Sequence, residues 1–207
     1  MIFFTKIIHF IMATTKLRSI DESHGIMHSL QTLHNAYAIV DNEKYNIPEL
    51  KEQEKIIYVA AAIHDMCDNK YMPEDEGIRK IDELLIEYLE LEEMDIVHEI
   101  IGKMSYSKVK KNGFPDMGKY QFAYNVVREA DLLGAYDFDR AMVYHLYQKN
   151  SDLNDAYFDS MQLFLTRTFR HEHDGLLTFD YTRVRANELK PESLKQMKNW
   201  RRIIHMK

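Results

Sequence analysis

Along most of the chain, apolar residues recur at helical spacing, and short polar segments separate these stretches. Pro48, Pro73 and Pro191 stand where such stretches begin, and a glutamate follows each of them. Proline suits the first helical turn because its missing N–H would be unpaired there, and acidic side chains favour the positive end of the helix dipole. The pattern predicts helices over residues 22–41, 48–67, 74–90, 92–104, 118–135, 137–149, 152–172 and 191–205.

The longest break between predicted helices runs from Ser105 to Met117. It is polar and contains Gly113 and Pro115, so we expect a surface loop there. The whole chain holds only seven glycines and four prolines, about half the usual share, whereas a fold rich in tight β-turns needs more. We therefore predict one all-α domain over residues 1–207. Its core is expected at about 18–150, with C-terminal helices of 151–207 packed on it and an N-terminal extension over 1–17.

The first twelve residues, MIFFTKIIHFIM, are mostly apolar. A membrane span needs about 20 apolar residues, and Lys6 and His9 interrupt this shorter run. A secretory signal would carry basic residues ahead of the apolar run and a small-residue cleavage site behind it. Two alternatives stay open: a segment that docks on the domain, or an extension ahead of a second start at Met12.

Composition narrows the class of protein. The single cysteine, Cys67, excludes an intramolecular disulfide and fits a reducing compartment. The formal net charge of −6 argues against a protein that coats nucleic acid. We expect a cytoplasmic protein with neither a nucleic-acid nor a membrane partner.

Ionisable residues interrupt the apolar faces of three predicted helices. The run IIYVAAAIHDMC is apolar on every side until His64 and Asp65, and a helix of that kind is buried. Asp131 continues the apolar row of Ala123 and Val127. A buried carboxylate without a partner costs several kcal/mol. Each of these side chains therefore requires a charged or hydrogen-bonding neighbour.

The third interruption lies in the first predicted helix, where His24 and His28 are four residues apart and share a face. By itself the His64-Asp65 pair is better explained as a buried histidine in an ion pair. Together, however, imidazoles and carboxylates from three helices form a mixed N/O donor set. Such a set suits Mn, Fe, Co, Ni or Zn and leaves coordination positions for water and a phosphate oxygen.

These residues resemble the HD superfamily of metal-dependent phosphohydrolases, whose signature is His…His-Asp…Asp. The resemblance covers about residues 18–150. More narrowly, the chain is similar to small bacterial-type HD hydrolases with an His-x-x-x-His opening, an MS(F/Y)SK segment and a (D/E)AD motif. The matching segments here are His24–His28, Met104–Lys108 and Glu129–Asp131, with His64-Asp65 as the central motif.

The resemblance implies a compact HD-domain helical bundle that holds one divalent ion, which is Mn, Fe, Co, Ni, Zn or Mg. Binuclear members carry further histidines between the second and third motifs, whereas this chain has only His98 there. A mononuclear site is therefore expected. Relatives also continue the third motif with a second carboxylate, where this chain has Gly134. The implied metal ligands are His28, His64, Asp65 and Asp131.

The resemblance also implies roles around the ion. His24 or Glu129 would position the attacking water or carry protons, although Glu129 lies off the apolar row and is expected to be solvated. Lys108 and Arg140 would neutralise substrate phosphate. The implied partner is a small phosphorylated molecule, in the first place a nucleotide.

Hydrolysis of a phosphate ester or anhydride is the function that the resemblance implies. A cyclic or second-messenger phosphodiesterase is the alternative within the enzymes. Outside the enzymes, a degenerate HD module would bind nucleotide or metal without turnover, and a purely structural helical module would bind no metal.

Two other patterns are weaker. Gly113–Lys119 fits the start of a phosphate-binding P-loop, but Tyr120 replaces the required Ser or Thr and no apolar strand precedes it. We expect an ordinary loop. His171 and His173 are two residues apart and face different directions on a helix, so a solvated helix end is expected.

Overall fold

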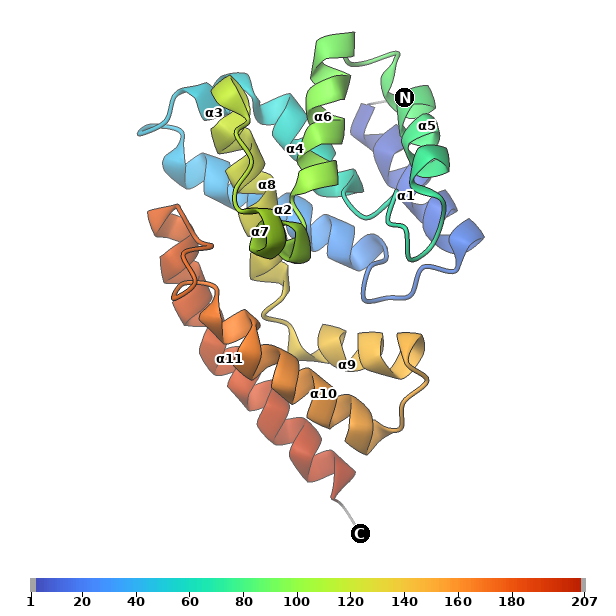
Figure 1. Cartoon of the computed structure of the whole chain (residues 1–207), viewed down its shortest axis with the longest axis vertical. Coiled ribbons are helices and arrows are strands. Elements are labelled where there is room, and N and C mark those ends of the chain that lie inside the picture. The colour runs from blue at the N-terminus through green and yellow to red at the C-terminus, as the bar shows by residue number, and fades with distance from the viewer. Residues whose placement is uncertain (1–2, 206–207) are drawn as a thin grey trace.

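The computed structural model describes residues 3–205, and no strand occurs among them, which confirms the all-α prediction (Figure 1). Two short 3-10 turns, Gly118–Tyr120 and Thr168–Arg170, accompany the α-helices. The helices are α1 (Phe3–Arg18), α2 (Ile26–Glu43), α3 (Glu49–Glu52), α4 (Glu54–Ile63), α5 (Glu74–Leu85), α6 (Leu91–Lys103), α7 (Tyr106–Asn112), α8 (Gln121–Gly134), α9 (Phe138–Gln148), α10 (Leu153–Thr166) and α11 (Asp180–Ile204).

Helices α2, α4 and α8 pack against one another at the centre of the larger hydrophobic core. The central position of α4 follows from its sequence, since Val59, Ala60 and Ile63 are apolar on different sides and all fully buried. Helices α1, α5 and α6 surround this centre (Figure 1). The central helices therefore bring their ends close together, and the predicted ligands lie at those ends.

A second, smaller core joins α9, α10 and α11 and contains Phe138, Phe164 and Met197. Figure 1 shows these three helices as a layer below the main bundle, with α11 running past both parts. Ala186 on α11 packs in the larger core, whereas Met197 packs in the smaller one. The C-terminal layer thus borders the ends of α2 and α8.

The N-terminal segment forms α1 and docks on the bundle, which is the first of the two alternatives. Ile7 and Ile11 are fully buried in the larger core. Residues 1 and 2 lie outside the part of the chain that the structure describes.

The prediction of a surface loop from Ser105 to Met117 is wrong in its first half, because α7 forms there. Ser105 caps the helix by accepting a hydrogen bond from the Lys108 N–H, and Val109 is buried. Gly113 ends the helix with a φ of 77°, a conformation that favours glycine. Seven residues are too few to show a clear apolar period, so the pattern missed this helix.

Several predicted helix boundaries also need correction. The helices predicted over 74–90 and 152–172 end earlier, at Leu85 and Thr166. The final helix begins at Asp180 and contains Pro191, because burial of Thr182 and Ala186 against the larger core outweighs the cost of a proline inside a helix. The helix predicted over 48–67 divides at Gln53 into α3 and α4 and ends at Ile63. The first predicted helix starts at Ile26, so its opening residues form a turn.

Among residues 3–205, no helix combines the length and the apolar character that a membrane crossing requires.

Candidate metal centre

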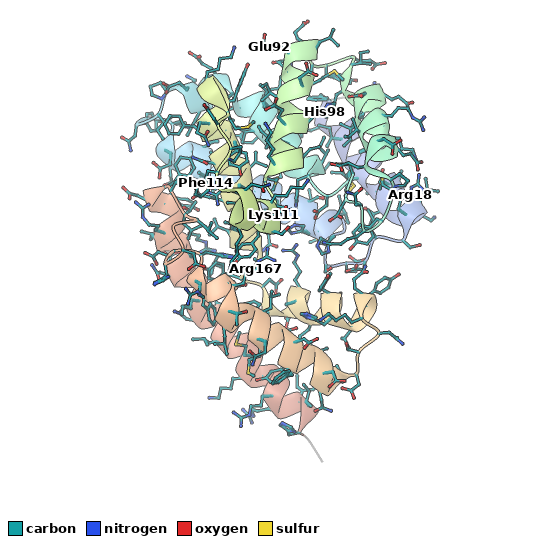
Figure 2. All side chains as sticks on the ribbon, in the orientation of Figure 1. Arg18, Glu92, His98, Lys111, Phe114 and Arg167 are labelled. Atoms are coloured by element: carbon teal, nitrogen blue, oxygen red, sulfur yellow. The ribbon has the colours of Figure 1, made fainter. Side chains whose placement is uncertain are left out.

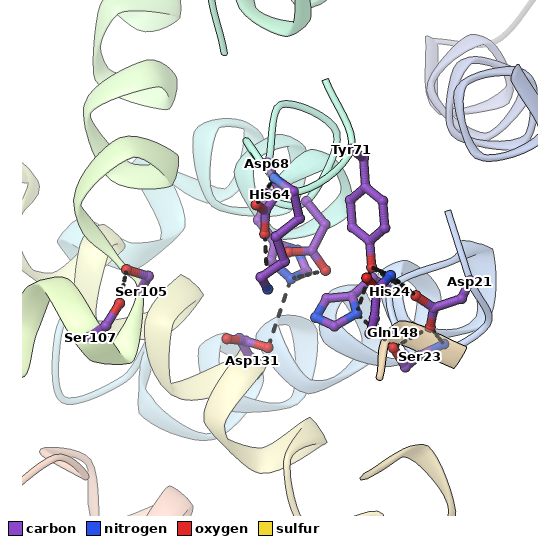
Figure 3. Close-up of polar contacts among 12 residues, drawn as sticks. Asp21, Ser23, His24, His64, Asp68, Tyr71, Ser105, Ser107, Asp131 and Gln148 are labelled. Atoms are coloured by element: carbon purple, nitrogen blue, oxygen red, sulfur yellow. Dashed lines mark hydrogen bonds and ion pairs between the residues drawn. The ribbon is translucent and has the colours of Figure 1, made fainter. Parts of the chain in front are cut away.

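The four predicted ligands come together at the ends of the central helices. His28 lies on α2 and Asp131 on α8, while His64 and Asp65 directly follow α4. His28 Nε2 lies 3.0 Å from His64 Nε2. Asp131 Oδ1 is 3.2 Å from His28 Nε2, and Asp65 Oδ2 is 3.2 Å from His64 Nε2. Asp131 Oδ1 also lies 3.8 Å from His64 Nε2 (Figure 3). Two imidazoles and two carboxylates therefore converge on one point.

The donor atoms of this cluster fit a divalent cation. His28, His64 and Asp65 each offer one ligand atom within 4.8 Å of the other two. Asp65 Oδ2 is buried and accepts no hydrogen bond from any residue in the described range. Nitrogen and oxygen donors in this proportion suit Mn, Fe, Co, Ni or Zn. A cation at the point of convergence would contact this carboxylate oxygen, which otherwise faces the two imidazoles.

Neighbouring backbone fixes the two histidine rings. His64 Nδ1 donates to the Ala61 carbonyl oxygen at 2.9 Å, which directs Nε2 towards the cluster. Gly134 lies against the other ring, where a Cβ atom would stand 3.4 Å from His28 Cε1. A long side chain at position 134 would push on that ring, so the glycine suits the position of His28.

Burial and mutual charge set the pKa values of the cluster. Burial, with Arg140 adding to it, lowers the pKa of His28 to about 4. Burial alone would lower the pKa of His64 as well, but the charges of Asp65 and Asp131 raise it to about 9. The His64 imidazolium holds the pKa of Asp65 below its usual range despite burial. A hydrogen bond with His28, together with the charge of His64, does the same for the pKa of Asp131. The cluster therefore holds two carboxylates that attract a positive charge.

Arg140 lies beside the cluster, as expected for a phosphate-binding residue. Its Nε donates to the Ser23 carbonyl oxygen, and its terminal Nη2 lies 3.1 Å from His28 Nε2. The guanidinium reaches this position from α9, the first helix of the C-terminal layer.

His24 also lies beside the cluster, but in the turn before α2 rather than on the helix. The turn forms because the Asp21 carboxylate accepts hydrogen bonds from Ser23. His24 Nδ1 lies 2.7 Å from Ser23 Oγ and 3.2 Å from the Tyr71 hydroxyl (Figure 3). With Nδ1 engaged, Nε2 is the nitrogen available for water or substrate.

Sequence reasoning missed the residues that hold this turn in place. Asp21 accepts hydrogen bonds from the Tyr71 hydroxyl at 2.9 Å and from Gln148 Nε2 at 2.8 Å (Figure 3). Burial raises the pKa of Asp21, but its hydrogen bonds with Ser23, Gln148 and Tyr71 lower it further. Tyr71 and Gln148 come from distant parts of the chain, so no local spacing could reveal them.

A cavity of about 430 Å³ opens onto the cluster. Asp65 and Asp131 line it from the bundle, and His24 lines it from the turn before α2. Arg140 and Arg167 line it from the C-terminal layer. The cavity is large enough for a small phosphorylated molecule.

Glu129 does not line this cavity, which corrects its predicted catalytic role. It is also buried, which corrects its predicted solvation. Its fully buried carboxylate accepts hydrogen bonds from the N–H and hydroxyl of Thr178, at 2.8 and 2.6 Å, and from the Thr182 hydroxyl. Arg128, also buried, lies 3.1 Å away. Burial raises the pKa of Glu129, and these partners oppose that rise. The residue joins α8 to the start of α11.

Lys108 is likewise not brought to the cavity. Its Nζ donates to the Gly102 carbonyl oxygen at 2.6 Å, at the C-terminal end of α6. A cation is stabilised by the carbonyl groups of a helix end, which explains this position. His98 is on α6, and its Nε2 lies 3.0 Å from Oδ1 of Asp82 on α5. His98 therefore does not join the cluster either.

His171 is buried, which differs from the predicted solvated helix end, whereas His173 is exposed as predicted. The side chain of His173 is 77% exposed, but His171 is 0% exposed and packs near Tyr106 and Tyr136. Neither ring nitrogen of His171 has a hydrogen-bond partner among the residues that the structure describes. Burial, with Arg167 adding to it, lowers its pKa to about 3.

This buried histidine predicts a pH dependence of folding stability. Above about pH 6.5 it is neutral in both states and contributes nothing. Below that pH the unfolded chain binds a proton that the folded chain excludes, so stability falls by about 1.4 kcal/mol per pH unit towards pH 3. We expect His171→Phe to remove this loss, which amounts to about 2 kcal/mol between pH 7 and pH 5. Urea unfolding at both pH values measures it, and an identical pH effect in both proteins would contradict it.

Comparison with known proteins supports the fold alone. No protein-family model matches the chain, and a search of curated proteins finds no match either. Among solved structures, the chain is similar to a Lactobacillus plantarum protein whose crystal structure was a structural genomics target. The TM-score is 0.71 at 17% identity, and the similarity covers 96% of this chain and 95% of the other. The two proteins share the fold, and the similarity carries no statement about activity.

Proposed function

We propose that this chain is an HD-superfamily phosphohydrolase that uses one divalent metal ion to cleave a phosphate ester or anhydride of a nucleotide. The main support for this proposal is the convergence of four side chains at the base of a cavity that Arg140 also lines. These side chains are His28, His64, Asp65 and Asp131. The order of these residues along the chain supports the family assignment. The buried single cysteine supports a cytoplasmic, reducing location.

The chemistry follows from the donor set and its surroundings. His28, His64, Asp65 and Asp131 would hold a divalent ion, which when bound would supply a water whose pKa is lowered from 15.7 towards about 7. His24 faces the same cavity and holds the proton that moves during attack. Arg140 binds a phosphate oxygen and offsets the negative charge that develops there.

A nucleotide screen tests this function. The purified protein is incubated with added Mn²⁺ and a panel of nucleoside mono-, di- and triphosphates and cyclic nucleotides, and the products are identified by mass. We expect release of phosphate or pyrophosphate that a chelator stops. Turnover of cyclic nucleotides alone would favour the phosphodiesterase alternative. Binding without turnover would favour a non-catalytic module, and a protein without affinity for metal would contradict the proposal.

His24→Ala provides a sharper test of the site. Because His24 contacts Ser23 and Tyr71 rather than the cluster, the variant should keep its metal. Loss of an acid–base group should reduce turnover by about 10²–10⁴-fold. Elemental analysis and steady-state kinetics measure the two effects. A variant that purifies without metal would make His24 a ligand, and full activity would give it a structural role only.

A further inference from the structure

Arg167 enters the cavity from a part of the chain that the family resemblance does not cover. It follows the last residue of α10 and lines the same cavity as Asp131 and Arg140. Figure 2 shows Arg167 where the main bundle meets the C-terminal layer. The C-terminal helices thus contribute a second arginine to the candidate site.

Among the residues that the structure describes, the guanidinium of Arg167 has no carboxylate or hydrogen-bond acceptor as a partner, unlike the other cations of the cavity. Lys70 Nζ lies 3.2 Å from Asp68, and Lys149 Nζ lies 2.9 Å from Asp159. Arg140 donates to a backbone carbonyl. Within residues 3–205, the Arg167 side chain forms neither an ion pair nor a hydrogen bond. The guanidinium of Arg167 therefore borders the cavity without a counter-charge bound to it, and a bound anion is the expected complement.

The ring of Tyr106 holds this guanidinium in place. Arg167 Cζ lies 4.0 Å from the ring centroid of Tyr106, the first residue of α7. Burial lowers the pKa of Arg167, and the charge of Asp131 opposes that shift. The guanidinium remains charged at every physiological pH. Stacking on the ring leaves its N–H groups free to bind a ligand in the plane of the guanidinium.

Within the described residues, the carboxylates that line the cavity form no ion pair with the guanidinium of Arg167. Asp68 is paired with Lys70. Asp137 caps α9 by accepting a hydrogen bond from the Asp139 N–H at 3.0 Å. Asp65 and Asp131 belong to the metal cluster. Asp131 acts on Arg167 through its charge but forms no ion pair with it, so the guanidinium is available to an anion.

We propose that Arg167 is a specificity-determining residue that binds a second phosphate group of the substrate, beside the one at the metal cluster. This inference rests on the proposed function. A guanidinium binds phosphate through two parallel hydrogen bonds. Arg140 on α9 and Arg167 directly after α10 face one cavity, so the site favours a substrate with linked phosphates over a monophosphate. Tyr106 acts as a positioning residue for Arg167.

Anion binding by the metal-free protein tests the proposal without any turnover. Calorimetry with inorganic tripolyphosphate and orthophosphate compares wild type, Arg167→Met and Arg167→Lys. The matched control is Arg185→Met, since Arg185 is a surface residue of α11 paired with Glu188. We expect wild type to prefer tripolyphosphate and Arg167→Met to bind it about 10- to 100-fold more weakly. Arg167→Lys should fall between them, and the control should match wild type.

The Tyr106 variants separate positioning from a general loss of structure. Tyr106→Phe keeps the ring and should bind tripolyphosphate as wild type does. Tyr106→Leu removes the stacking surface and should weaken binding by about three- to tenfold. Circular dichroism confirms that each variant is folded. If Arg167→Met does not fold, the comparison of Arg167→Lys with wild type decides the matter.

The outcomes distinguish this inference from the proposed function. Equal tripolyphosphate affinity in wild type and folded Arg167 variants would overturn the inference, as would a wild type that binds neither probe. Arg167-dependent binding without nucleotide turnover would keep the anion site and contradict the hydrolase. With turnover present, Arg167→Met should raise KM for nucleoside triphosphates far more than for monophosphates.

Discussion

Purified His64→Ala and Asp65→Ala proteins are expected to contain no divalent metal and to show no turnover, with wild-type helical content. Both residues follow Ile63, the last residue of α4, and their side chains face the cluster. The packing of α4 comes from the apolar residues before them, so the fold survives the substitutions. Each variant loses one of four donors, and Asp65→Ala also removes the charge that attracts the cation. Elemental analysis, circular dichroism and phosphate release measure the three properties.

His34→Ala is the matched control, because His34 is an exposed histidine on α2, the helix that also carries His28. It should retain both metal and activity. Normal metal content in either His64→Ala or Asp65→Ala would contradict the ligand assignment. Loss of helical content in both would instead show that the buried pair stabilises the bundle by itself.

Glu129→Ala is expected to lower the free energy of unfolding by about 3–5 kcal/mol, the range for breaking a buried ion pair. The substitution leaves the buried guanidinium of Arg128 without its carboxylate. It also removes the acceptor of both Thr178 hydrogen bonds and of the Thr182 hydroxyl. Urea unfolding measures the loss. The folded fraction should still bind metal, since Glu129 lies outside the cluster.

Glu99→Ala is the control for this loss, because Glu99 forms an exposed ion pair with Lys103 on α6. Its expected effect is below about 1 kcal/mol. A Glu129→Ala protein as stable as wild type but inactive would restore the catalytic role and contradict the structural one.

The sequence by itself predicted the all-α fold and the four residues of the cluster. His64, Asp65 and Asp131 could be found because an ionisable side chain on an apolar helical face is costly unless it has a partner. That rule is local, since helical periodicity alone says which face is buried. Prediction of the helices succeeded for the same reason, except where a segment was as short as α7 or where packing overrode Pro191.

Only the tertiary structure decided what each buried charge contacts. Glu129 stands two residues before Asp131, yet it binds Thr178 and Thr182 because α11 packs against α8 on that side. Arg167 and the Tyr106 ring are 61 positions apart and meet only where the C-terminal layer meets the bundle. Periodicity along one helix reports burial, but the neighbouring element that covers a face is set by long-range packing. The sequence therefore located the residues of the cluster, and the fold determined the residues that surround them.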